Sequence, residues 1–597
     1  MSGAADQIND STADLGSGPG SETGVAQLIE GLVLMRMILL RRLITTVDAE
    51  AAARAGLREA YRTLAELQTD RPEVVSSMLT YPATGSWLVR VLRRAAGADG
   101  DAVPLWADCA YLGWLAAAAS ITCREEGTAQ VVIRNGVIML PTFGLARLAA
   151  PEYSGPCEIS WTAAGAVHFT WSSGSVRIIS RAGESHADWL PLRWVRGADD
   201  EARVWLDDLD PFRSLPPGQP APPRLTAGQA GRWQRTFTDA WRLLRSDHAP
   251  YLAPMRGCLT SVVPLSVEPL TASTSHTDFH GVGCVYTTAP ADPCQLALTL
   301  IHEIQHTKFA MLTDQAEVCT PDPACRFYAP WRDDPRPIHG LLHGIYAFFG
   351  VTDFWRVHRH SACHQSLQAH TDFELWRVQV AGAIAQARES GLLGDAGRRL
   401  LDALAAAMIP WASADLPPEA RRAATEAAVG HRTFWQVRNL EPDPAGIADL
   451  VSRWDAGRSA TGELPRSTLV DQQRIPDQHR RLPLAARLKT LDPRAAKALS
   501  DDRPPEGERA YLAGYATEAL ALYSRELRAD PLRPQVWAGL NLAGRKIFGG
   551  NGFEILDERA EVAARLYEAV GPDADIVELL RWLSAPITVG GFEPAMR

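Results

Sequence analysis

The stretch Leu296-Ala-Leu-Thr-Leu-Ile-His-Glu-Ile-Gln-His306 is an apolar run that ends in two histidines. Asp292 and Pro293 precede it, and an acidic cap followed by a first-turn proline predicts the start of a helix. The histidines are four residues apart, so an α-helix places both imidazoles on one face, one turn apart. Two neutral imidazoles in this arrangement can bind one metal ion. We therefore expect a buried helix whose His302 and His306 are metal ligands facing an interior cleft.

Glu303, next to His302, has two roles open to it. In zinc peptidases with this motif the glutamate is the general base that acts on metal-bound water. Alternatively, its carboxylate orients a metal ligand or a neighbouring group without taking part in hydrolysis. The five-residue motif alone does not decide between these roles.

The metal needs at least one further ligand, and a second histidine pair can supply it. One extended zinc-peptidase pattern requires Gly at position 309 and His at position 312, where this chain has Phe309 and Leu312. His339 and His343 are again four residues apart, within the apolar run Pro337-Ile-His-Gly-Leu-Leu-His-Gly-Ile-Tyr-Ala-Phe-Phe-Gly350. We expect a helix here and one of these two histidines as the third ligand.

A turn rich in aromatic residues and proline, Phe327-Tyr-Ala-Pro-Trp-Arg-Asp-Asp-Pro-Arg-Pro337, precedes the second pair. Its Arg332 and Arg336 are either salt-bridge partners of Asp333 and Asp334 or a site for a carboxylate. A guanidinium binds a carboxylate in a bidentate way. A peptidase has little use for two such arginines beside its metal, whereas an oxygenase with a dicarboxylate cosubstrate would use them.

Patterning along the chain predicts a predominantly helical α+β protein. Asn135-Gly136 between apolar runs indicates a hairpin, and Pro216 to Pro223 is typical of a linker. Thr226 is placed to cap the helix that follows. The expected regions are a disordered tail over 1–24, a helical part over 25–125, an antiparallel β-rich part over 126–215, a helical metal-binding core over 225–450, a linker or exposed loop over 451–482 and a tetratricopeptide-like helical tail over 483–597.

The C-terminal tail carries a partial repeat pattern that covers about one and a half tetratricopeptide units. Stable arrays need about three units, so a plain helical hairpin is an equally good interpretation. A true repeat would offer a groove for a peptide or protein partner. The residues on repeat spacing are Gly514, Ala519, Tyr523, Pro531, Trp537 and Leu540.

Composition and charge indicate a cytoplasmic protein that binds neither nucleic acid nor membrane. A net charge of -10 gives no general basis for nucleic-acid binding. The nine cysteines are odd in number and scattered singly, which favours a reducing compartment. No secretory signal is evident, and the apolar run from Val25 to Arg36 is predicted as an amphipathic helix. The run from Tyr111 to Thr122 is too short to cross a bilayer and is predicted as a buried helix.

Three blocks of this chain resemble a known family. They are Leu300-Ile-His-Glu-Ile-Gln-His-Thr-Lys, Tyr328-Ala-Pro-Trp-Arg-Asp-Asp-Pro-Arg-Pro and Gly340-Leu-Leu-His-Gly-Ile-Tyr-Ala-Phe-Phe-Gly-Val. In this order they are similar to the HExxH-motif proteins of ribosomal-peptide (RiPP) biosynthesis clusters, which are 2-oxoglutarate-dependent peptide β-hydroxylases. The similar stretch runs from about Ser273 to Trp355.

The resemblance implies an Fe(II)- and 2-oxoglutarate-dependent dioxygenase that uses O₂ to hydroxylate the β-carbon of a residue in a precursor peptide. A radical-SAM or other peptide-modifying enzyme of the same cluster is a further expected partner. The third block places its histidine at His343, so the resemblance favours His302, His306 and His343 as metal ligands over a set with His339. It places the cosubstrate cation at Arg332 or Arg336 and leaves the choice open.

Two other functions are kept open. The first is a zinc metallopeptidase with Glu303 as the general base. The second is a peptide-binding scaffold whose tetratricopeptide-like tail acts and whose metal is structural. A closed structural zinc site prefers four protein ligands, often cysteines, and the scattered cysteines here do not supply them.

Overall fold

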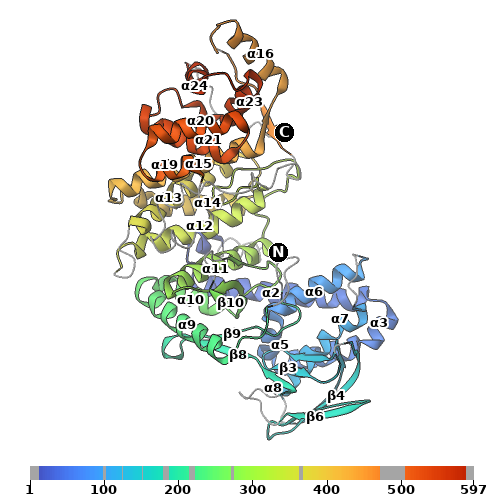
Figure 1. The fold of residues 1–597 in the computed structure, drawn as a ribbon. Coiled ribbons are helices and arrows are strands. Elements are labelled where there is room, and N and C mark those ends of the chain that lie inside the picture. The colour runs from blue at the N-terminus through green and yellow to red at the C-terminus, as the bar shows by residue number, and fades with distance from the viewer. Residues whose placement is uncertain are drawn as a thin grey trace. The chain divides into compact units, whose positions relative to one another are not determined.

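The computed structural model describes residues 12–97, 103–123, 126–150, 152–178, 187–213, 222–269, 274–361, 367–460, 462–470 and 505–585. The chain divides into two compact units, Met1–Ala316 and Glu317–Arg597 (Figure 1). Their boundary falls inside the 225–450 region that the sequence treats as one core. The two histidine pairs therefore belong to different units. The mixed, helix-dominated α+β class is confirmed.

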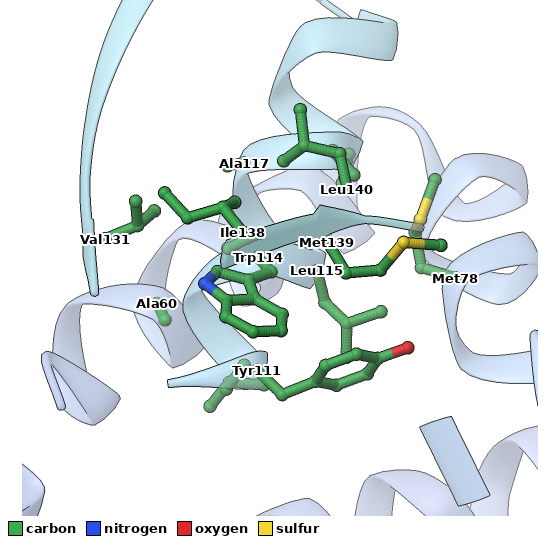
Figure 2. Packing of buried hydrophobic residues seen from close by; sticks show 14 of the residues in the cluster. Ala60, Met78, Tyr111, Trp114, Leu115, Ala117, Val131, Ile138, Met139 and Leu140 are labelled. Carbon is green, nitrogen blue, oxygen red and sulfur yellow. The ribbon is translucent and has the colours of Figure 1, made fainter. Parts of the chain in front are cut away.

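Helices form the start of the first unit, as predicted for residues 25–125. The predicted buried helix is confirmed as α8, in which eleven consecutive residues from Tyr111 to Ile121 are buried. Trp114 and Tyr111 of α8 lie in the main hydrophobic core, together with Met78 and Ile138 (Figure 2). The helices are α2 (Glu22–Thr46), α3 (Ala49–Arg54), α4 (Leu57–Asp70), α5 (Pro72–Thr80), α6 (Pro82–Ala95), α7 (Leu105–Cys109) and α8 (Tyr111–Cys123).

Residues 12–24 differ from the disordered tail predicted over 1–24. Leu15 is fully buried, and the carboxylate of Asp14 accepts a hydrogen bond of 2.7 Å from the amide of Ser21. The Ser21 hydroxyl caps α2 by accepting from the amide of Gly24 at 3.0 Å. The polar composition of this segment did not indicate its buried residues, among them Leu15 and Thr12. Residues 1–11 of the predicted tail lie outside the described residues.

Helix α2 is long and apolar enough to cross a membrane by length and composition, and a third of its most apolar window is buried in the fold. Its Arg36, at the end of the run predicted as an amphipathic helix, is buried. The guanidinium donates to the carbonyl oxygens of His280 at 2.9 Å, Tyr81 at 3.3 Å and Leu79. Burial lowers the pKa of Arg36 to about 10, against the opposing pull of nearby carboxylates. The helix is thus tied to the interior of the first unit.

Two antiparallel sheets follow, as predicted for the β-rich region. Asn135 and Gly136 both have positive φ, at 49° and 77°, as the primed turn of a tight hairpin requires. One sheet has the order β1-β4-β5-β6 and the other the order β2-β3-β7. The strands are β1 (Gly127–Ile133), β2 (Val137–Leu140), β3 (Gly144–Arg147), β4 (Gly155–Trp161), β5 (Val167–Trp171), β6 (Gly174–Ile178) and β7 (Trp189–Pro191).

A third sheet joins the end of the predicted β segment to strands that follow it in the chain. Its order is β11-β12-β10-β9-β8, and β10 is parallel to both β9 and β12. Parallel neighbours need a long crossover, and α9 and α10 supply it between β9 and β10. The strands are β8 (Arg193–Arg196), β9 (Arg203–Leu206), β10 (Ser261–Pro269), β11 (Ser275–His276) and β12 (Cys284–Ala289).

Three helices, α9 (Ala227–Asp247), α10 (Leu252–Cys258) and α11 (Pro293–Gln315), complete the first unit. The predicted cap of α9 is confirmed, because Thr226 forms a capping box with Gln229. The predicted start of α11 is also confirmed, since the Asp292 side chain accepts from the amide of Gln295 at 2.8 Å. The linker predicted at 216–223 falls almost entirely outside the described residues.

The second unit is helical apart from one short strand pair, β13 (Leu440–Pro442) with β14 (Ser467–Leu469), among its described residues. This pair lies partly in the stretch 451–482 that was predicted as a linker. The first helices are α12 (Ile338–His358), α13 (Leu367–Glu389), α14 (Asp395–Met408), α15 (Pro418–Asn439) and α16 (Pro444–Asp455).

The C-terminal helices share a core around Trp537, Tyr523 and Tyr567. Gly539 allows close packing of α20 on α21, because a Cβ there would meet the Tyr523 ring at 2.3 Å. A helical pair is therefore present, and its tetratricopeptide character stays a prediction. The helices are α19 (Glu506–Leu512), α20 (Ala516–Ala529), α21 (Pro534–Phe548), α22 (Ile555–Glu558), α23 (Ala560–Val570) and α24 (Ile576–Ser584).

Candidate metal and carboxylate sites

The first histidine pair lies on α11, on one face as the spacing predicts. The ring centroids of His302 and His306 are 4.8 Å apart, and the ring planes are nearly perpendicular at 86°. Both side chains are half-buried, so they remain open to a small ligand. Burial lowers the pKa of His302, against the opposing effect of Glu303. A neutral imidazole at neutral pH is the form that binds a metal.

Glu303 is buried beside this pair, with its side chain 1% exposed. Its Oε2 accepts a hydrogen bond of 2.6 Å from the hydroxyl of Thr277, and its Oε1 lies 4.0 Å from Nε2 of His302. Thr277 directly follows β11, so the third sheet positions the carboxylate. A carboxylate beside two imidazole rings favours a cation at this part of α11.

The back of α11 holds the N-terminal segment of the chain. Gln305 and the buried Lys308 both donate to the carbonyl oxygen of Gly18, at 3.2 and 3.1 Å, and Lys308 also donates to that of Pro19. Burial lowers the pKa of Lys308 to about 7, while Cys258 and Asp14 act in the opposite direction. These contacts fix the rotation of α11 about its own axis and hence the face that carries the histidines.

The second pair lies on the first two turns of α12. The rings of His339 and His343 are 4.6 Å apart with an interplanar angle of 62°. His339 is exposed, whereas His343 is 4% exposed. The pKa of His343 is lowered to about 3, mainly by burial and further by His339 and Arg336. The second pair is thus less uniform than the first, with one buried and one accessible imidazole.

The two arginines of the preceding turn share one carboxylate. Arg332 Nε donates to Oδ1 of Asp334 at 2.9 Å, and an NH group of Arg336 donates to Oδ2 of the same residue at 3.1 Å. Burial would raise the pKa of Asp334, but the two guanidinium groups outweigh it and lower that pKa. The salt-bridge interpretation is confirmed for Asp334. The Asp333 carbonyl oxygen instead accepts from Arg438 and from Asn439 at 2.8 Å.

Each arginine donates one N–H group to Asp334, and each guanidinium carries five N–H groups. The ion pairs with Asp334 therefore occupy only a minority of these donors. Arg336 lies over the first turn of α12, because a Cβ at Gly340 would be 3.2 Å from its Nε. The turn is held by backbone hydrogen bonds between Phe327 and Arg336 and by Trp331, which stacks on Phe348 at 4.8 Å. The second unit therefore brings a positively charged group next to His343.

The predicted site residues thus fall into two groups. His302, Glu303 and His306 lie together in the first unit. Arg332 and Arg336 lie with His339 and His343 in the second unit. The structure describes each group within its own unit, so the assignment of His343 as third ligand stays a prediction.

Two contributors were not predicted from the sequence. Thr277 stands in the polar run Ser273-Thr-Ser-His-Thr, and no spacing rule links that run to Glu303. Lys308 stands on the predicted metal helix, where a lysine among apolar residues could have indicated a buried polar contact.

No family model matches the chain, and a search of curated proteins also finds no match.

Proposed function

We propose that the protein is an Fe(II)- and 2-oxoglutarate-dependent hydroxylase that acts on the β-carbon of a residue in a ribosomally made precursor peptide. The observation that carries the proposal is the position of Arg336 beside His343 at the start of α12. A cation next to a candidate imidazole ligand suits a cosubstrate that carries a carboxylate at each end. When bound, ferrous iron with 2-oxoglutarate and O₂ supplies oxygen insertion into a C–H bond, with succinate and CO₂ as co-products.

The residues of α11 fit a divalent metal by their donor chemistry. His302 and His306 offer imidazole nitrogens, which suit iron and zinc equally well. Glu303 adds a fixed negative charge, and its hydrogen bond from Thr277 holds it in place. In this proposal Glu303 orients the neighbouring His302 and contributes to the electrostatic potential at the site. It is not a hydrolytic base. A radical-SAM or other peptide-modifying enzyme would act on the same peptide.

The arginine turn fits the distal carboxylate of 2-oxoglutarate. Arg336 is partly buried, with 36% of its side chain exposed, against 52% for Arg332. Electrostatic attraction is screened less in the more buried position, so Arg336 is the stronger candidate. Asp334 pairs with both guanidinium groups and holds them in place.

The test is anaerobic titration of the full-length protein with Fe(II) and then with 2-oxoglutarate. We expect one ferrous ion per chain, a visible charge-transfer band on addition of 2-oxoglutarate, and succinate after O₂ is admitted. A zinc-loaded protein that cleaves peptides and loses this activity in Glu303→Gln would replace the proposal with a metallopeptidase. Metal binding with neither 2-oxoglutarate binding nor peptide cleavage would replace it with a scaffold that carries a structural metal.

A further inference from the structure

The second unit contains a cavity of about 480 Å³ that is separate from the arginine turn. This volume falls within the range of ligand-sized pockets. Helices α15 and α21 form its walls. The lining residues are Pro418, Arg421, Arg422, Thr425, Glu426, Val429, Leu542, Arg545 and Lys546.

The lining follows one face of each helix. On α15 the positions from Pro418 to Val429 recur every three or four residues, which is the spacing of a single helix face. At 1.5 Å per residue this face is about 17 Å long. On α21, Leu542, Arg545 and Lys546 have the same spacing. An extended chain rises about 3.3 Å per residue, so the cavity has the length of about five peptide residues.

Positive charge dominates the lining, with four cationic side chains and a single carboxylate, Glu426. Arg422 pairs with Glu419 at 3.3 Å, and Lys546 lies 4.0 Å from Glu426. The Arg422–Glu419 pair is exposed, and exposed ion pairs are weak and exchange readily for a competing carboxylate. For the exposed Arg421, the described part of the chain supplies no ion-pair partner.

The lining also favours a peptide over a nucleic acid. The partly exposed Val429 offers apolar surface beside the cations, which suits an aliphatic side chain of a peptide. Single-stranded nucleic acids bind where a basic groove also presents aromatic rings for base stacking. None of the nine lining residues is aromatic.

We propose that this cavity binds an acidic, partly apolar segment of the peptide substrate, at a distance in sequence from the residue that is modified. The identity of the peptide as the substrate rests on the proposed function. The cavity would then bind the peptide, and the histidine and arginine residues of the proposed function would bind the metal and the cosubstrate. Carboxylates of the peptide would pair with Arg421 and Lys546, and its apolar residues would cover Val429.

The experiment measures binding of a fluorescein-labelled decapeptide of alternating Glu and Leu to the full-length protein by fluorescence anisotropy. A matched peptide of alternating Lys and Leu is the charge control. We expect saturable binding of the acidic peptide that weakens with salt, with or without iron. Arg421→Glu and Lys546→Glu should each weaken it about tenfold or more. Arg398→Glu, an exposed arginine on α14 of the same unit, should leave it unchanged.

Four results would overturn the inference. These are absence of saturable binding, equal binding of the lysine peptide, an equal loss in Arg398→Glu, and tighter binding of a single-stranded RNA than of the acidic peptide. Circular dichroism confirms that each variant is folded. Because binding is measured without turnover, a failure here leaves the iron and 2-oxoglutarate titrations unaffected. A failure of those titrations likewise leaves the binding result standing.

Discussion

The two histidine pairs have the same spacing and nearly the same ring separation, 4.8 Å on α11 and 4.6 Å on α12, but opposite electrostatic surroundings. On α11 the pair adjoins the buried carboxylate of Glu303. On α12 the buried member of the pair, His343, adjoins the guanidinium of Arg336. Both pairs are predicted from the same i, i+4 rule, yet their neighbours differ in sign.

This difference separates two tasks that one sequence motif cannot distinguish. A negative neighbour lowers the free energy of a bound cation, whereas a positive neighbour raises it and favours an anion. The pair on α11 should therefore dominate metal affinity. The α12 region should act more strongly on the negatively charged cosubstrate than on the metal.

The largest effect is expected from loss of either histidine on α11. His302→Ala and His306→Ala should each lower Fe(II) affinity by at least about 100-fold, since even changes to residues behind a metal ligand cost about 10- to 100-fold. Anaerobic metal titration followed by metal analysis measures this. His168→Ala in the same unit is the control. Unchanged metal content in both α11 variants would mean that α11 is not the metal site.

Loss of the guanidinium fork comes next. Arg336→Lys should raise the apparent Kd for 2-oxoglutarate about 10- to 100-fold, because a charge-assisted bidentate pair contributes roughly 1.5–3 kcal/mol. Arg332→Lys should act less, since Arg332 is more exposed. The charge-transfer band of the anaerobic Fe(II) protein reports binding. Arg388→Lys, at a surface ion pair with Asp402, is the control. If the Arg332 and Arg336 variants both bind 2-oxoglutarate as the wild type does, the two arginines act only as ion-pair partners of Asp334.

The two histidines of α12 should differ from each other. His343→Ala should lower metal affinity by about tenfold, a smaller loss than on α11 because of the neighbouring arginine. The exposed His339 serves as the matched control, and His339→Ala should keep full metal content. The reverse result would move the third ligand to His339.

The smallest effect on metal binding concerns the support of Glu303. Thr277→Val removes the hydroxyl that donates to the Glu303 carboxylate and should lower the free energy of unfolding by about 1.5–3 kcal/mol. Metal affinity should fall less than in the histidine variants. Thr277→Ser keeps the hydroxyl and should restore most of the stability in denaturant titrations. Equal stability of the valine and wild-type proteins would show that Glu303 does not depend on this bond.

Local signals predicted the local structure well. The cap at Asp292, the turn at Asn135-Gly136 and the buried helix from Tyr111 are confirmed, because each depends on residues within one or two turns of one another. The parallel pairing of β10 with β9 and β12 was not predicted. Register between distant strands depends on which surfaces meet after the helices fold, and no short pattern encodes it.

The candidate sites show the same division. The spacing of His302 and His306 predicted their common face, because helix geometry alone decides it. The carboxylate shared by Arg332 and Arg336 was only half predicted, since the choice of Asp334 over Asp333 depends on how the turn closes. The contact of Thr277 with Glu303 spans 26 residues and could not be read from either segment alone.

The anchoring of the N-terminal segment on α11 has a consequence for synthesis on the ribosome. Gly18 and Lys308 are 290 residues apart. At about 5–20 residues per second, the nascent N-terminal segment waits roughly 15–60 s for its partner helix to emerge. During that interval α2 lacks both the carbonyl of His280 and the surface of α11. Chaperones that bind apolar nascent helices therefore have an opportunity to bind α2 before α11 has been synthesised.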